Sequence, residues 1–310
     1  MIGRYSHHIK TPLIKGRMIN DTQIYYKLDN LQPSGSFKDR GIGFMIDTLI
    51  RDGSVKSLVT SSGGNAGHSV AVVGERLSIP VTCFVPITTS QYMIEKIKSR
   101  GTRVVVGGAN WNEADAKAKE LLEDKSIAYI PPFDNPLIWD GNSSIIDELK
   151  EDLPNTAIDG IVVSVGGGGL LAGIQRGIER HKWDQTKVFG VETEGAASYA
   201  LAKREGKVVS LDKIDTIAST LGALAVTSSV LNSKVSCESV VVSDKDAVEA
   251  CLKFVDEHRI LVEPACGASL SLINSPARFA GLKNLVFIVC GGSAVSLQLL
   301  DSWKKKFNIQ

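Results

Sequence analysis

A lysine in a serine-rich segment is the first residue of this sequence that could act chemically. Lys38 lies in PSGSFKDRG (33–41), where Ser34 or Ser36 could cap a helix whose first turn contains the lysine. A cation there opposes the helix dipole, which lowers the pKa of an amine and suits Schiff-base or general-base chemistry. The alternative, which this segment alone favours, is a solvated surface turn formed by the Lys-Asp-Arg triplet.

Four consecutive glycines form a second candidate site. They follow the apolar run 160–165 and precede an apolar helical pattern, and they are Gly166, Gly167, Gly168 and Gly169. Glycine permits positive φ and close approach of the backbone, and N–H groups at a helix N-terminus bind anions such as phosphate. The segment therefore predicts an anion site, with a tight packing turn as the alternative.

The same segment also fits a dinucleotide-binding pattern. Gly167, Gly169 and Ala172 match G-x-G-x-x-G/A, and Glu192 ends the next strand, where an acid that binds ribose is expected. Any run of four glycines satisfies much of this pattern. A nicotinamide cofactor would also leave the other glycine-rich segments unexplained.

Two further polar segments follow expected strands. SSGGNAGH (61–68) offers hydroxyls, an amide and backbone N–H groups that suit a carboxylate or a ring oxygen, although helix capping is an equal alternative. VCGGS (289–293) places Cys290 at the end of a core strand, where a cysteine is more often a small buried apolar residue.

Short apolar runs that alternate with helical patterns must position these segments. The expected strands cover residues 57–60, 81–85, 104–106, 160–165, 187–191 and 284–289. Such alternation predicts an α/β fold of mostly parallel sheets flanked by helices, with ligands beyond the carboxyl ends of the strands. We expect a small domain, residues 35–134, and a large one formed by residues 1–34 and 135–310.

Composition narrows the partners and the compartment. The chain has 310 residues, of which 43% are hydrophobic and 22% charged, and its formal net charge is +1. Neither nucleic acid nor a membrane is therefore expected as the main partner. Five cysteines without a CxxC pair argue against a disulfide framework or a structural zinc site. Without a secretory segment or an apolar run of about 20 residues, we expect a cytoplasmic protein with a small-molecule ligand.

Seven motifs stand in the order of a known family. PSGSFKDRG, SSGGNAG, SVGGGGL and CGGS are joined by PFDN (132–135), GVET (190–193) and EPACG (263–267). Over essentially its whole length the chain resembles fold-type II pyridoxal-phosphate enzymes, and more narrowly the L-serine/L-threonine dehydratase group. The resemblance implies a tryptophan synthase beta-like fold, pyridoxal 5'-phosphate as the cofactor and, by analogy, a homodimer.

The resemblance also implies roles for residues around the cofactor. Lys38 would carry the cofactor covalently, Phe37 would stack on one face of its ring, and Asn65 would reach the ring hydroxyl. Gly166 to Gly169, extended by Leu170, would hold the phosphate.

The implied reaction is loss of water from L-serine to give pyruvate and ammonia, or from L-threonine to give 2-oxobutyrate. A neutral Cys290 thiol would face the pyridine nitrogen, which favours elimination over transamination. Racemases that resemble the same scaffold carry a serine where this chain has Gly63, so we expect little racemization. The residues implied to bind the substrate carboxylate are Ser62, Gly63, Gly64, Asn65 and Ala66.

A structural cation is implied beside the phosphate site. Its ligands would be the Glu192 side chain and the carbonyls of Ala196, Leu221 and Ala223. Racemase-type sites have a second carboxylate where Ser198 stands here, which favours potassium over magnesium or calcium. The alternative is a surface glutamate that ends a strand.

Other activities stay open at this point. A threonine dehydratase or a β-replacing relative such as cysteine synthase shares the scaffold, and details of the carboxylate loop separate them. A binding protein that has lost turnover is a further alternative, against which Lys38 argues.

Overall fold

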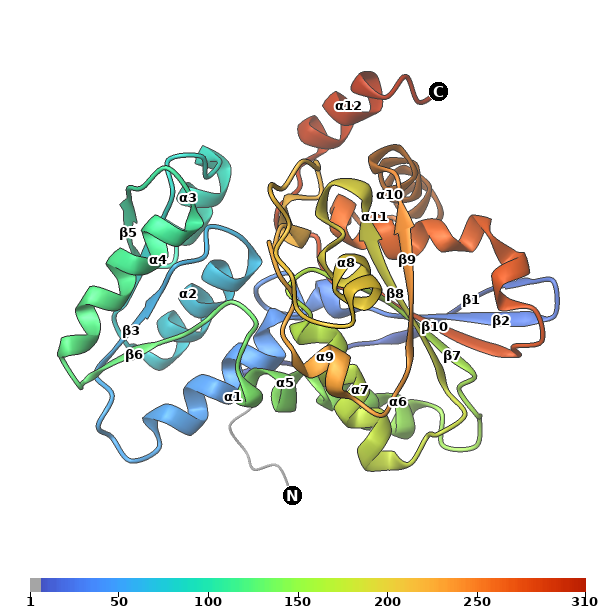
Figure 1. The fold of residues 1–310 in the computed structure, drawn as a ribbon, viewed down its shortest axis with the longest axis horizontal. Coiled ribbons are helices and arrows are strands. Elements are labelled where there is room, and N and C mark those ends of the chain that lie inside the picture. The colour runs from blue at the N-terminus through green and yellow to red at the C-terminus, as the bar shows by residue number, and fades with distance from the viewer. Residues whose placement is uncertain (1–6) are drawn as a thin grey trace. The chain divides into compact units, whose positions relative to one another are not determined.

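The computed structural model describes residues 7–310, which divide into two compact units (Figure 1). The first unit contains Gln32–Gly141 and the N-terminal segment that ends at Ile9. The second unit contains Lys10–Leu31 and Asn142–Gln310. This division differs from the sequence-based one in assigning residues 32–34, residues 135–141 and the segment before Lys10 to the first unit.

The first unit is built on a parallel four-stranded sheet with the order β5-β4-β3-β6. Its strands are β3 (Ser57–Thr60), β4 (Val81–Val85), β5 (Arg103–Val106) and β6 (Ile127–Tyr129). Its helices are α1 (Lys38–Ile50), α2 (Asn65–Leu77), α3 (Gln91–Lys98), α4 (Trp111–Glu120), the 3-10 turn η2 (Leu121–Glu123) and α5 (Pro136–Asn142), whose last residue begins the second unit. Because parallel crossovers are right-handed, α2 and α3 cover one face and α4 returns over the other.

Local sequence explains where these helices begin. Ser90 accepts a hydrogen bond from the backbone N–H of Met93 at the start of α3, and Asn110 accepts one from Glu113 at the start of α4. The helices then bury apolar side chains against the sheet. The core of this unit includes Ile42, Ile46, Leu58, Val70, Val73 and Ile130.

The second unit contains a six-stranded sheet with the order β1-β2-β10-β7-β8-β9. Only the pairing of β1 with β2 is antiparallel among its described strand pairs. All five residues of β7 are buried, as expected for a central parallel strand covered on both faces. The strands are β1 (Leu13–Ile19), β2 (Thr22–Lys27), β7 (Gly160–Ser164), β8 (Lys187–Thr193), β9 (Cys237–Val242) and β10 (Asn284–Ile288).

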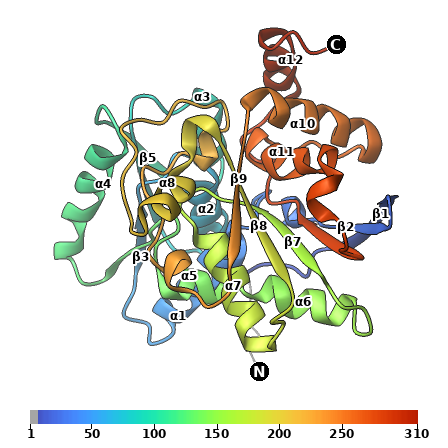
Figure 2. The ribbon, with the colours of Figure 1, turned by 45° about the vertical axis from the view of Figure 1, so that its right-hand side comes forward.

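Helices cover both faces of this second sheet. Figures 1 and 2 show α6 and α7 on one face and α10 and α11 on the other. The helices are α6 (Ser144–Asp152), α7 (Gly169–His181), α8 (Ser198–Glu205), α9 (Ser229–Asn232), α10 (Asp244–His258), α11 (Pro264–Ser271) and α12 (Leu297–Lys306). The 3-10 turns are η1 (Asp29–Leu31), η3 (Glu194–Ala196), η4 (Ser219–Leu221), η5 (Leu272–Asn274) and η6 (Pro276–Phe279). The expected α/β class, with a mostly parallel sheet flanked by helices in each unit, is confirmed.

A buried lysine fastens the N-terminal strands of the second unit to α6. Lys27 is fully buried, and its ammonium lies 2.7 Å from Glu148 and 2.9 Å from Asp152. It also donates a hydrogen bond to the Thr11 carbonyl at 2.7 Å. Every donor of this buried cation therefore has an acceptor, which is the condition for burying a charge.

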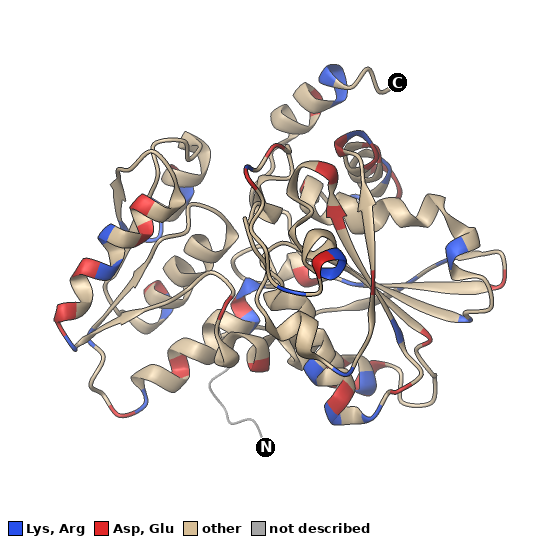
Figure 3. Cartoon of the chain, in the orientation of Figure 1, with Lys and Arg blue, Asp and Glu red and all other residues tan. Residues whose placement is uncertain are grey.

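Charged residues of both signs alternate along outer helices such as α4 (Figure 3). Between residues 7 and 310 no helix is long and apolar enough to span a membrane. All five cysteines are buried free thiols.

Candidate active site

The segment around Lys38 is held from within by Asp39. The carboxylate accepts hydrogen bonds from the Ser34 backbone N–H at 2.7 Å and from the Ser69 hydroxyl at 2.6 Å. Asp39 and Arg40 are fully buried, so the alternative of a solvated surface turn is wrong. Burial raises the pKa of Asp39, and the hydrogen bonds from Ser34 and Ser69 oppose that rise.

The expected serine cap of this helix is also wrong. The N-cap residue of α1 is Phe37, and no side chain caps the helix. Ser34 and Ser36 instead lie with their hydroxyls 3.4 Å apart. The Ser34 N–H donates a hydrogen bond to the buried Asp39 carboxylate. Ser34 therefore contacts the first turn of the helix through its backbone, and its hydroxyl does not cap the helix.

Lys38 is the first residue of α1 and is partly buried. Its ammonium donates a hydrogen bond of 2.5 Å to the Pro132 carbonyl and lies 5.1 Å from the centre of the Phe37 ring. The motif at 33–41 therefore meets the motif at 132–135 inside the first unit. The Lys38 ammonium therefore lies beside an aromatic ring, an arrangement that stabilises a cation.

The loop after β3 is shaped by close backbone contacts. The Ser62 carbonyl accepts a hydrogen bond from the Cys83 thiol at 3.2 Å, and the Ser62 hydroxyl accepts one from Gly64 N–H at 3.3 Å. A Cβ on Gly67 would lie 1.8 Å from the Ser62 carbonyl oxygen, so only glycine fits there. Asn65 begins α2 behind an extended Gly64, and Ala66 follows it as a buried residue.

His68 joins this loop to the Lys38 segment, a contact that sequence reasoning missed. Its Nδ1 lies 2.9 Å from the Ser34 carbonyl, and the next residue, Ser69, reaches Asp39. Burial lowers the pKa of His68 to about 4, and repulsion from Lys96 adds to that shift. The imidazole is neutral at physiological pH. The motif SSGGNAGH contained the histidine, but nothing in it revealed the partner.

The four glycines of the second unit link β7 to α7. Gly168 has φ of +85° and is the N-cap of α7, and Gly169 begins that helix of 13 residues. A Cβ on Gly166 would lie 3.1 Å from the Leu221 backbone. Leu170 is buried in the first turn. The glycines before Leu170 carry no side chains, so the backbone N–H groups at the helix start are accessible, which fits a phosphate.

Glu263 joins two loops of the second unit, one of which contacts Gly166 through Leu221. It is buried, accepts a hydrogen bond from the Thr220 hydroxyl at 2.7 Å and accepts another from Ala294 N–H at 3.0 Å. Cys290 is buried and lies two residues after the end of β10, at the start of the loop that contains Ala294. A hydrogen bond with Cys266 and burial raise the pKa of Cys290 well above its ordinary value, so its thiol is neutral.

Glu192 is fully buried at the end of β8, so its interpretation as a surface glutamate is wrong. Its carboxylate accepts hydrogen bonds from the backbone N–H groups of Tyr199 at 2.7 Å and Ala200 at 2.8 Å, at the start of α8. Burial raises its pKa to about 7, against the effect of these bonds. An acid committed in this way does not fit the ribose-binding role of the dinucleotide pattern.

The other expected cation ligands lie on two turns. Ala196 ends η3 and Leu221 ends η4, and the Leu221 carbonyl accepts a hydrogen bond of 2.8 Å from Ala223 N–H. From residue 7 onward, no three His, Cys, Asp or Glu side chains gather as metal ligands would.

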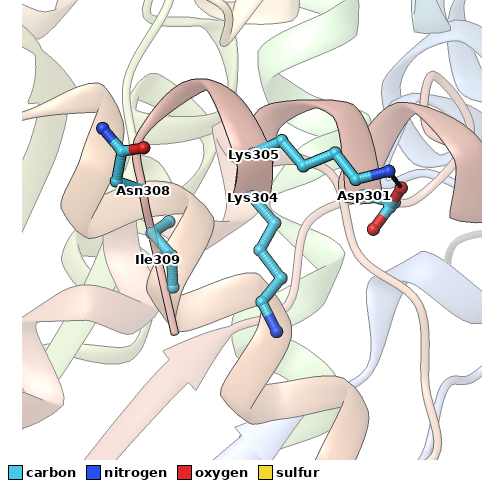
Figure 4. Close-up of a pocket in the computed structure, with 5 residues that line it drawn as sticks. All are labelled: Asp301, Lys304, Lys305, Asn308 and Ile309. Atoms are coloured by element: carbon cyan, nitrogen blue, oxygen red, sulfur yellow. Dashed lines mark ion pairs between the residues drawn. The ribbon is translucent and has the colours of Figure 1, made fainter.

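A surface pocket near the end of α12 contains none of the candidate residues. Its lining consists of Asp301, Lys304, Lys305, Asn308 and Ile309 (Figure 4). Asp301 and Lys305 form an exposed pair at 2.6 Å, one helical turn apart.

Comparisons with known proteins identify the family. A family model described as "Pyridoxal-phosphate dependent enzyme" matches residues 5–291. The L-serine dehydratase/L-threonine deaminase of Mus musculus is 42% identical over 326 residues, which cover 100% of this chain and 98% of the mouse protein. The L-serine dehydratase of Dictyostelium discoideum is 40% identical and covers 95% of this chain and 91% of its own length. The crystal structure of a fungal L-serine ammonia-lyase from Rhizomucor miehei aligns with a TM-score of 0.90 at 32% identity, covering 97% of this chain and 99% of that one. The chain therefore belongs to the family of pyridoxal-phosphate-dependent enzymes.

Proposed function

We propose that this enzyme is an L-serine dehydratase that also acts on L-threonine. It removes water from L-serine to give pyruvate and ammonia, and L-threonine gives 2-oxobutyrate and ammonia. The main support for this function comes from the first unit, where His68 and Ser69 in α2 contact the segment that contains Lys38. These contacts connect the segment of the Lys38 amine to the helix that follows the loop 61–64, whose hydroxyl and N–H groups are hydrogen-bond donors.

Residues of the first unit would hold the reactive part of the cofactor. Pyridoxal phosphate, when bound, supplies a conjugated electron-withdrawing group that makes the α-proton of an amino acid acidic. We propose that Lys38 Nζ attaches it and later takes up the α-proton of the substrate. Phe37 packs against one face of the ring, and Asn65 binds the ring hydroxyl.

Residues of the second unit would hold the phosphate and the ring nitrogen. The backbone from Gly166 through Gly167, Gly168 and Gly169 to Leu170 binds the phosphate, because its glycines leave the start of α7 uncovered. The neutral Cys290 thiol faces the ring nitrogen. A neutral partner cannot hold a full pyridinium charge as a carboxylate does, which favours prompt loss of the β-hydroxyl.

The substrate carboxylate would bind at the loop after β3. The binding residues proposed are Ser62, Gly63, Gly64, Asn65 and Ala66, whose backbone is held by the contacts described above. Gly63 has no hydroxyl that could return a proton to the opposite face of the substrate. Elimination is therefore expected without appreciable racemization.

One set of incubations tests this function. The holoenzyme is supplied separately with L-serine, L-threonine and D-serine, and 2-oxo acid and ammonia are measured while chiral chromatography follows D-serine. Both L-amino acids are expected to release 2-oxo acid and ammonia in equal amounts. Absence of ammonia with both would contradict the function, and D-serine formed from L-serine would contradict the role given to Gly63.

We further propose that a potassium ion binds at Glu192 with the carbonyls of Ala196, Leu221 and Ala223. The burial of Glu192 supports this, because a nearby cation stabilises a buried carboxylate in its ionised form. Potassium chloride is expected to raise the Tm above that in tetramethylammonium chloride of equal ionic strength, and Glu192→Gln should lose the difference. Equal Tm values in the two salts would contradict the proposal.

A cytoplasmic homodimer is the assembly and location that we propose. The five buried free thiols fit a reducing compartment, and dimerisation is argued by analogy with related enzymes. Sedimentation equilibrium tests the dimer, and a fluorescent fusion tests the compartment. A monomer at micromolar concentration, or fluorescence confined to an organelle, would contradict the respective statement.

A further inference from the structure

A buried carboxylate with three partners lies in the first unit among residues to which no role has been given so far. Asp115, on α4, is 6% exposed. The Ser61 hydroxyl donates to its Oδ1 at 2.7 Å, and the Tyr129 hydroxyl donates to the same oxygen. Lys119 lies 2.6 Å from Oδ2, and the Ser61 and Tyr129 hydroxyls are 3.1 Å apart. We call these four residues the Asp115 cluster.

The ionisation states of Asp115 and Tyr129 make the carboxylate the hydrogen-bond acceptor of the cluster and the tyrosine hydroxyl a donor. Burial alone would raise the pKa of Asp115, but hydrogen bonds from Lys119, Tyr129 and Ser61 outweigh it and lower the pKa below its usual value. Burial and the bond to Asp115 raise the pKa of Tyr129, which keeps its hydroxyl a donor. Hydrogen bonds to an ionised carboxylate are stronger than those between neutral groups.

The cluster lies where two neighbouring strands end. Ser61 directly follows β3, and Tyr129 is the last residue of β6, which pairs with β3. The Ile130 N–H donates to the Val59 carbonyl at 2.8 Å beside them. One strand continues into the loop that begins at Ser62, and the other continues toward Pro132, whose carbonyl accepts the hydrogen bond of Lys38.

The helix and the sheet have other anchors, so the carboxylate is not needed to keep them in place. Helix α4 is capped by Asn110 and buries Ala114 and Ala118 completely. The strands are joined by their own backbone hydrogen bonds. Loss of the Asp115 charge is therefore expected to free the two strand ends rather than to unfold the unit.

We propose that Asp115 is a positioning residue for the substrate site. By holding Ser61 and Tyr129, its carboxylate keeps the loop 62–66 in the place that the substrate carboxylate requires. The inference rests on the proposed function of this loop. Because the cluster acts on the carboxylate loop before any bond is broken, it governs KM more than kcat.

The test compares holoenzyme variants with a matched control on the same helix. Asp115→Asn keeps the shape and removes the charge, Tyr129→Phe removes one donor, and Glu120→Gln changes an exposed residue of α4. We expect KM for L-serine to rise about tenfold in Asp115→Asn, as for loss of a charge-assisted hydrogen bond, and less in Tyr129→Phe. Turnover number should change by less than about threefold, and Glu120→Gln should match the parent.

Hydrogen exchange of the peptide that covers residues 58–66 gives a second readout that does not need turnover. Faster exchange in Asp115→Asn, with unchanged exchange in α1, supports the positioning role. Unchanged KM and unchanged exchange would overturn it, and so would a fall in kcat and Tm with KM constant. If the parent enzyme itself releases no 2-oxo acid, the proposed function fails, while the exchange result still decides whether Asp115 orders the loop.

Discussion

The side chain of Thr89 lies directly against Gly63. A Cβ on Gly63 would be 2.6 Å from the Thr89 Cγ2 atom, 2.7 Å from its Oγ1 atom and 3.2 Å from its Cβ atom. Rotation of the threonine side chain cannot relieve the last contact, because Cβ does not move. The space that a side chain at position 63 would occupy is therefore filled by Thr89, which lies in the segment after β4.

This contact predicts that Gly63→Ala impairs the enzyme through Thr89. The added methyl group should displace the loop and cost about 1–3 kcal/mol, as overpacking of a filled site does. KM for L-serine is expected to rise. The double variant with Thr89→Ala should recover most of the loss, and Thr89→Ala alone should fold normally. A double variant no better than Gly63→Ala would show that Thr89 is not the obstacle.

The buried Lys27 predicts a large effect on the stability of the second unit. Lys27→Met leaves Glu148 and Asp152 without their shared buried cation, and such a loss costs about 3–5 kcal/mol. Urea unfolding of the variant measures it. Lys305→Met, which breaks an exposed pair with Asp301, should change stability by less than about 0.5 kcal/mol. Similar losses in both variants would contradict the description of Lys27 as the anchor of β2.

His68 predicts a specific dependence of stability on pH. Its pKa falls from 6.5 to about 4 on folding, so the unfolded chain binds a proton between these values before the folded protein does. Stability from this group is therefore complete above pH 6.5 and is lost as the pH falls toward 4, by about 3 kcal/mol. His68→Gln should remove that slope. A variant whose stability keeps the full slope would contradict the buried neutral imidazole.

Glu192 acts in the opposite direction over an overlapping range. Its pKa rises from 4.5 to about 7 on folding, so its contribution is complete below pH 4.5 and is lost as the pH rises through 7. Glu192→Gln should therefore make the protein relatively more stable near pH 8 than near pH 5. Urea unfolding at these two pH values, in buffers without potassium, measures the change. The reverse order would show that the carboxyl is ionised in the folded protein even without the cation.

The strands and the motifs were largely predictable, because apolar runs bounded by glycine and serine report local structure. β4 was expected at its observed bounds, and the start of α7 at the glycines was expected from their position after β7. Contacts between residues far apart in the sequence could not be predicted. Asp39 binding Ser34, His68 reaching the Ser34 carbonyl, and Asp115 holding Ser61 depend on the packing of helices, which no spacing along the chain reveals.

The burial of charged residues was the second feature that could not be predicted from the sequence. The Lys-Asp-Arg triplet at 38–40 looks like a solvated turn, yet Asp39 and Arg40 are completely buried. Composition favours exposure of such residues unless partners are at hand. The partners of Asp39 come from Ser34 nearby and from Ser69 on another helix, and only the fold supplies the second.

The attachment of the cofactor to Lys38 is the central claim, and one measurement tests it most directly. The holoenzyme is reduced with borohydride, digested, and analysed by mass spectrometry for the peptide that contains residues 33–41. We predict loss of the yellow colour together with a reduced pyridoxal-phosphate adduct on the ε-amine of Lys38. An unmodified Lys38 peptide from fully loaded enzyme, with the adduct on another lysine or on none, would contradict it.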